Sequence, residues 1–162
     1  MQISDLRLQI LIQSAILNLH SEINSYQSQP VSDILPEQSN QPNSAELREQ
    51  ITNIASRYRN FQCVECAQAI KEFLSEQSVR GKHIKIYTGT SESPYGYIYH
   101  DRLGENIATN GRHEGILVVI DGQQLVFDNI EREGVTQEVW LQNLYSPILD
   151  IGIDFQITEE NF

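Results

Sequence analysis

The chain has 162 residues, 40% of them hydrophobic, which suits one folded domain with additional segments. Its formal net charge is −11, and it lacks the clustered cations that nucleic acids and anionic membranes require of a partner. No stretch predicts a transmembrane span or a cleavable signal peptide, and two cysteines are too few for a disulfide framework. We therefore expect a protein made in the cytoplasm, with no nucleic-acid or membrane partner. Export as an effector without a cleavable signal stays open.

The N-terminal part differs in composition from the rest of the chain. Residues 3–26 carry apolar side chains at helical spacing, and they predict a helical extension over residues 1–27. Residues 28–43 contain three prolines among many Ser, Gln and Asn residues, which is typical of a linker or long loop. The main domain is then expected over residues 44–162.

Two helices are predicted at the start of this domain. The first, over residues 45–59, has an apolar stripe and a capping residue in Asn43 or Ser44; the stripe consists of Leu47, Ile51, Ile54 and Tyr58. The second runs from about Cys63 to Ser78, with the inward-facing residues Ala67, Ile70, Phe73 and Leu74.

Strands dominate the rest of the chain. Alternation predicts strands in "KHIKIYTG" and "YGYIYH", and two apolar runs flank Asp121-Gly122, a dipeptide that favours a type I′ hairpin turn. Residues 136–144 predict a short helix that begins at Thr136, with Trp140 in the core. Helices followed by an antiparallel sheet indicate an α+β fold.

Three residues form a candidate thiol site. Cys63 begins a predicted helix, where the helix N-terminus favours a thiolate. His113 and Asp128 both fall at the open end of the predicted hairpin, on neighbouring strands. A carboxylate there can bond one imidazole nitrogen and leave the other nitrogen for the thiol.

The stretches "FQCVECAQAIKEFL", "NGRHEGILVVIDGQQLVFDNI" and "GVTQEVWLQNL" resemble the papain-fold toxin domains of bacteria, most closely papain fold toxin 2. They are also similar to protein-glutaminase deamidases, which place a small residue four after the catalytic cysteine and apolar residues seven and eleven after it. Counted from Cys63, these positions are Ala67, Ile70 and Leu74.

The resemblance implies a papain-like fold, with N-terminal helices packed on a small antiparallel sheet. It implies Cys63 as nucleophile, His113 as base and Asp128 as orienter in a hydrolase of protein amides. Peptidase and glutamine deamidase both stay open, because they use the same catalytic groups. Gln62 and Asn129 are further candidates for oxyanion or orienting roles. A protein or peptide substrate and a cognate immunity protein are the expected partners, and we expect no cofactor.

Other interpretations of the two cysteines also stay open. Both could be small buried hydrophobic residues, or Cys66 could be a redox partner of Cys63. A zinc site would need two further ligands, but the histidines are scattered, so we expect no metal. The rival class of function is a non-catalytic binding or immunity-like module with a papain-like fold.

Overall fold

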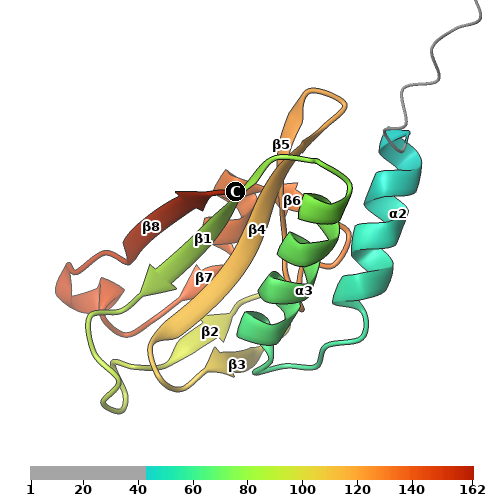
Figure 1. Ribbon diagram of the computed structural model, residues 1–162. Helices are drawn as coiled ribbons and strands as arrows, with labels where there is room; N and C mark the ends of the chain where they lie inside the picture. Colours follow the sequence, from blue (N-terminus) through green and yellow to red (C-terminus); the bar gives the residue numbers. More distant parts are fainter. Residues whose placement is uncertain (1–42) are drawn as a thin grey trace, which may run out of the picture. The chain divides into compact units, whose positions relative to one another are not determined.

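The computed structural model describes residues 43–162 (Figure 1). The predicted extension over residues 1–27 and nearly all of the predicted linker over residues 28–43 lie outside the described residues. None of the described helices is long and apolar enough to cross a membrane.

Helix α2 spans Ser44–Ala55, and Asn43 caps it by accepting hydrogen bonds from the backbone of Ala45 and Glu46. The predicted stripe faces inward, with Leu47 and Ile51 buried. The helix ends four residues earlier than predicted. The amide of Tyr58 bonds back three residues, to the carbonyl of Ala55, and this tight turn directs the chain toward the next helix.

Helix α3 spans Cys63–Glu76 and begins where the sequence predicted. Its predicted inward residues Ala67, Ile70 and Leu74 are fully buried, and Phe73 is half-buried. The helix ends before Ser78, because that residue has a φ of 57°, outside the right-handed helical region.

A five-stranded antiparallel sheet forms the centre of the domain. Its order is β6-β5-β4-β1-β8, with the strands β1 Gly81–Tyr87, β4 Arg112–Ile120, β5 Gln123–Phe127, β6 Val135–Thr136 and β8 Gln156–Asn161. The predicted hairpin is β4–β5. Its turn residues Asp121 and Gly122 have φ values of 51° and 76°, and two positive φ values are what a type I′ turn requires.

A second sheet of three strands adds to the predicted architecture. Its order is β3-β2-β7, with the strands β2 Ile98–His100, β3 Glu105–Ala108 and β7 Leu144–Tyr145. The short helix α4, Gln137–Gln142, lies between β6 and β7 in the chain, and Thr136 caps it as predicted. The 3₁₀ helix η1, Leu149–Ile151, precedes β8.

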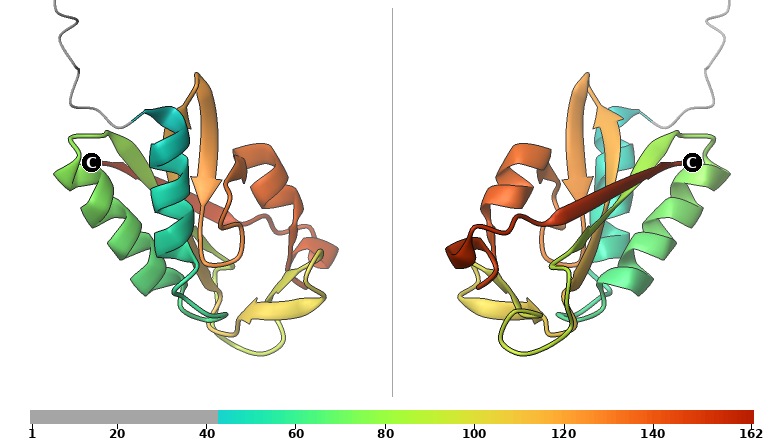
Figure 2. Two further views of the ribbon diagram at one scale, coloured as in Figure 1. Left: turned by 90° about the vertical axis from the view of Figure 1, so that its right-hand side faces the viewer. Right: turned by 90° about the vertical axis from the view of Figure 1, so that its left-hand side faces the viewer.

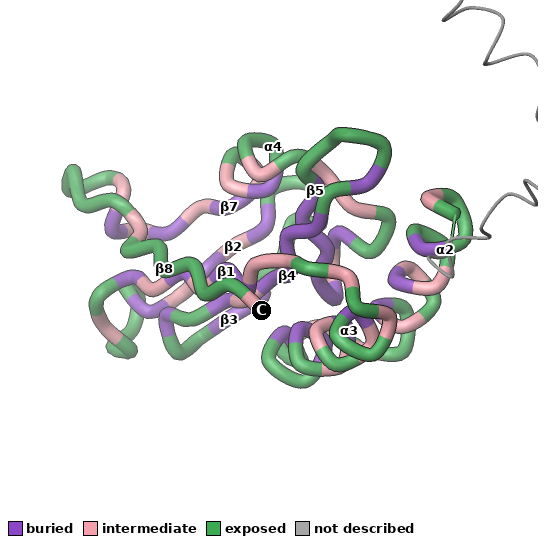
Figure 3. Tube along the Cα trace, turned by 45° about the horizontal axis from the view of Figure 1, so that its top comes forward, coloured by how far each residue is buried: buried purple, intermediate pink, exposed green. Residues whose placement is uncertain are grey.

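The central strands of the five-stranded sheet are covered on both faces. Helices α2 and α3 cover one face, and the second sheet with α4 covers the other (Figure 2). Successive β4 residues point into different cores: Val118 packs with the helices, and Leu117 packs with Trp140. This explains why the apolar run over residues 115–120 shows little alternation. The buried residues of this sheet concentrate in β1, β4 and β5, whereas those of β8 are exposed at the sheet edge (Figure 3).

Candidate active site

Cys63 is the first residue of α3, and its side chain is almost completely buried. Two side chains hold the chain that leads into this helix. Asn60 donates its amide to the carbonyl of Asn106 in β3 at 2.9 Å, and the Gln62 side-chain oxygen accepts from the amide of Arg59 at 2.8 Å. Because no side chain caps the helix, its first N–H groups remain available beside the thiol.

His113 is the second residue of β4 and pairs with Ile86 of β1, which places it in the interior with 1% of its surface exposed. Its Nε2 atom lies 2.8 Å from Oδ2 of Asp128. The Trp140 ring stacks on the imidazole, with centroids 5.7 Å apart and an interplanar angle of 28°. Within residues 43–162, the Nδ1 atom of His113 has no hydrogen-bond partner.

Asp128 directly follows β5 and is also buried. Its Oδ1 atom accepts from the backbone amides of Ile130 and Glu131, each at 2.6 Å. Its Oδ2 atom accepts from His113 and from Nε1 of Trp140, the latter at 2.7 Å. Four donors therefore surround the carboxylate. Although burial would raise the pKa of Asp128, the bonds from His113, Trp140 and Glu131 lower it below its usual value.

These contacts decide which imidazole nitrogen faces Asp128 as a donor. Because the carboxylate only accepts, Nε2 keeps its proton in both charge states of the ring, and Nδ1 is the nitrogen that gains or loses a proton. Burial by itself would lower the pKa of His113, but its interactions with Asp128 and the neighbouring Cys63 raise it to about 9. Cys63 is a neighbour of the ring rather than an aligned hydrogen-bond partner, since Nδ1 makes no bond of good geometry.

The sequence model described as Papain fold toxin 2 matches residues 46–145, more than half of the chain. The chain belongs to the papain fold toxin 2 family. Its α+β architecture is accordingly a papain-like fold, and the match includes Cys63, His113 and Asp128. No curated protein and no solved structure gives a significant match.

The papain-like domain should lose stability in alkaline solution because of His113. Its folded pKa, about 9, lies above the ordinary value of 6.5, so the stabilising contribution is fully present below pH 6.5. That contribution is lost as the pH rises through 9. Asp128 acts in the opposite sense: its lowered pKa stabilises the fold above its ordinary value of 3.8 and stops doing so as the pH falls.

Urea unfolding of the wild type and His113→Gln between pH 6 and pH 10 measures this effect. We expect the stability difference between the two proteins to shrink as the pH rises through 9. A difference that is constant across this range would show that His113 does not bind its proton more tightly in the folded state.

Cys66 lies one helical turn after Cys63 and faces the core. It has no exposed surface and packs among the apolar residues of α2, α3, β4 and β5. Burial, with the negative charges of Asp128 and Cys63, raises the pKa of Cys66 to about 12. Both thiols are free. The predicted redox role of Cys66 would need a thiolate that this environment strongly disfavours.

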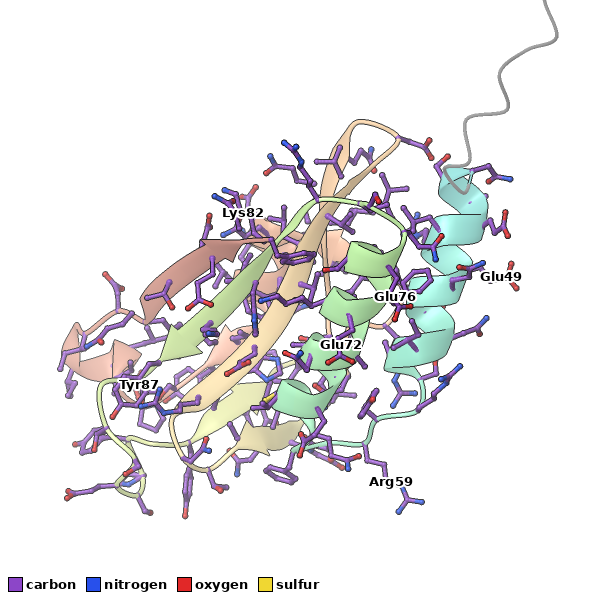
Figure 4. All side chains as sticks on the ribbon, viewed as in Figure 1. Glu49, Arg59, Glu72, Glu76, Lys82 and Tyr87 are labelled. Carbon is purple, nitrogen blue, oxygen red and sulfur yellow. The ribbon has the colours of Figure 1, made fainter. Side chains whose placement is uncertain are left out.

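Asn129 and Gln62 hold the chain before the thiol in place. Asn129 donates its amide to the carbonyl of Arg59 at 2.8 Å and does not bond the imidazole, whose carboxylate partner is Asp128. The Arg59 side chain points outward from the α2–α3 connection (Figure 4). One segment after β5 therefore supplies Asp128 to His113 and Asn129 to the loop before Cys63, which couples the two halves of the site.

Sequence reasoning missed two polar contributors. Trp140 was predicted only as a core residue, yet it both stacks on His113 and bonds Asp128. Glu131, which donates its backbone amide to Asp128, is itself buried, and its carboxylate accepts from His100 at 3.1 Å and Asn143 at 2.8 Å. An aromatic residue at a helical core position and an acidic residue in an apparent turn carry no sequence signal for these roles.

In residues 43–162, no group of three His, Cys, Asp or Glu side chains is placed to hold a metal ion.

Proposed function

We propose that this papain-like toxin domain is a cysteine hydrolase of protein amides, with Cys63 as nucleophile, His113 as base and acid, and Asp128 as orienter. One observation carries the proposal. The His113 ring is fixed by Asp128 on one nitrogen, while the other nitrogen has no hydrogen-bond partner among the described residues and Cys63 is its neighbour. A ring held in this tautomer is prepared to take a thiol proton.

The proposed reaction runs in two steps. The Cys63 sulfur adds to the amide carbonyl, His113 gives its proton to the departing nitrogen, and the C–N bond breaks to leave a thioester. Water then gives a proton to His113 while it attacks the thioester, and this step releases a carboxylic acid and restores the thiol. The backbone N–H groups at the start of α3 support the oxyanion, and the Gln62 amide is a second candidate donor.

The leaving group separates the two reactions that this site supports. A peptidase releases an amine with a new N-terminus, whereas a glutamine deamidase releases ammonia. The proposed physiological setting is a toxin or effector that acts on proteins of a target cell, with an immunity protein as its inhibitor. The chemistry is open to direct assay with a mixture of denatured proteins as substrate.

Ammonia and new N-termini should both be measured, with Cys63→Ala as the blank. We expect one of the two products from the wild type and neither from the variant. Equal product from both proteins would contradict the proposal. If the wild type forms no product and Cys63 is unreactive toward alkylating agents, the rival function as a binding module gains support instead.

A further inference from the structure

A pocket lies beside Cys63, at the junction of three segments. It encloses about 200 Å³ between the start of α3, the end of β3 and the β3–β4 connection. Two larger pockets, of about 410 and 350 Å³, lie elsewhere, and Cys63 lines neither of them. Because Cys63 lines the smaller pocket, this pocket is the candidate entry for a substrate of Cys63. Its volume is below the ~300–1,000 Å³ of pockets that enclose whole small molecules, and it suits a single side chain.

The lining of this pocket is apolar on one side and basic on the other. Phe61 and Val64, which flank Cys63, are 56% and 53% exposed, and Ile107 of β3 adds a buried apolar surface. Among the described residues that line the pocket, Arg112 is the only charged one. This is notable in a chain whose net charge is −11, because the surface as a whole repels anions.

Arg112 is held in position by contacts other than an ion pair within residues 43–162. Its guanidinium lies over the ring of Tyr87, 4.3 Å from the ring centroid. Tyr87 lies at the end of β1 (Figure 4). Its backbone amide donates to the side chain of Asn110 at 3.1 Å. Among the described residues, no carboxylate oxygen lies within 4.0 Å of its nitrogens, whereas Lys82 and Lys85 of the same sheet are both paired with glutamates. The guanidinium can therefore bind an acidic group of another molecule.

We propose that this pocket selects substrates with an acidic side chain next to the amide that Cys63 attacks. The inference rests on the proposed function, since it assigns the substrate class of the same site. The carboxylate would bond the Arg112 guanidinium, and the apolar stem would pack on Phe61 and Val64.

Two alkylating reagents, one anionic and one neutral, test the proposed preference for acidic groups without a known substrate. Iodoacetate carries a carboxylate next to the carbon that sulfur attacks, and iodoacetamide is its neutral counterpart. The ratio of their rates at Cys63, measured by peptide mass spectrometry at low salt, reports attraction of the anion. Because a change in thiol reactivity affects both reagents, it cancels in the ratio. We expect Arg112→Gln to lower the ratio by about threefold to tenfold, the size expected of one charge in partly solvated protein.

Arg80→Gln is the matched control, because it removes the same charge from a pocket away from Cys63. Arg80→Gln should leave the rate ratio at its wild-type value. Arg112→Lys, which keeps the positive charge, should retain most of the wild-type ratio. An unchanged ratio in Arg112→Gln, with Cys63 still reactive, would overturn this inference and leave the proposed function standing. If wild-type Cys63 reacts slowly with both reagents, the proposed function fails, and this inference fails with it.

Discussion

Replacing Asp128 with asparagine is expected to destabilise the domain by about 2–5 kcal/mol and to slow chemistry at Cys63 by about 10²–10⁴-fold. The carboxylate accepts from four N–H donors, two on each oxygen. Asparagine has one oxygen and one NH₂ group. Whichever way the amide turns, two donors therefore face another donor instead of an acceptor. When the NH₂ group takes the place of Oδ2, the Nε2 proton of His113 loses its acceptor, and the ring is no longer fixed in the reactive tautomer.

Urea unfolding gives the stability of this variant, and the alkylation rate of Cys63 gives its reactivity. Asp150→Asn is the matched control: Asp150 is exposed and accepts one bond, from the Tyr145 hydroxyl. It should change neither quantity appreciably. If Asp128→Asn were as stable and as reactive as the control, the carboxylate would have no role in orienting His113.

The second large effect is expected at Gly111, two residues before His113. Gly111 has a φ of 74° and bonds the backbone on both sides, donating to Gly96 at 2.6 Å and accepting from Thr88 at 2.9 Å. A Cβ atom there would overlap the Thr90 carbonyl oxygen and lie 2.5 Å from Oγ1 of Thr88. Alanine should cost more than about 3 kcal/mol, because backbone atoms must move in addition to the cost of a positive φ.

Gly122→Ala separates these two causes. Gly122 has a φ of 76°, almost the same as Gly111, but no atom lies within 4 Å of its virtual Cβ. It should therefore show only the conformational cost, about 1–2 kcal/mol. Urea midpoints of the two variants measure the difference. Equal midpoints would mean that the connection before β4 adapts easily and does not fix the position of His113.

The hairpin was predictable because its signals are local. Asp121-Gly122 sets the turn, and counting outward from it places His113 and Asp128 together at the open end, where the structure has them. Cys63 was placed by the helical spacing of the residues that follow it. Patterns within a few residues in the sequence thus located Cys63, His113 and Asp128. The family resemblance then implied that the three act together as one site.

The remaining parts of the site depend on contacts between distant segments. Strand β8 is exposed along its whole length and lacks an apolar face, so its sequence carries no alternating pattern. Glu131 is buried, and the partners of its carboxylate, which are His100, Arg102 and Asn143, all come from outside its own segment. Arg112 carries no signal of a site role in the sequence, since only the fold brings it to the pocket of Cys63.

The central claim is that His113 activates Cys63, and the alkylation rate of each cysteine as a function of pH tests it most directly. Iodoacetamide labelling with peptide mass spectrometry reads Cys63 and Cys66 separately, in the wild type and in His113→Ala. The account predicts that Cys63 reacts at least about tenfold faster in the wild type than in His113→Ala below pH 8.5, where an ordinary thiol is mostly protonated, and that the buried Cys66 reacts slowly in both proteins. Slow and equal reaction of both cysteines, or a Cys63 rate that does not change without His113, would contradict it.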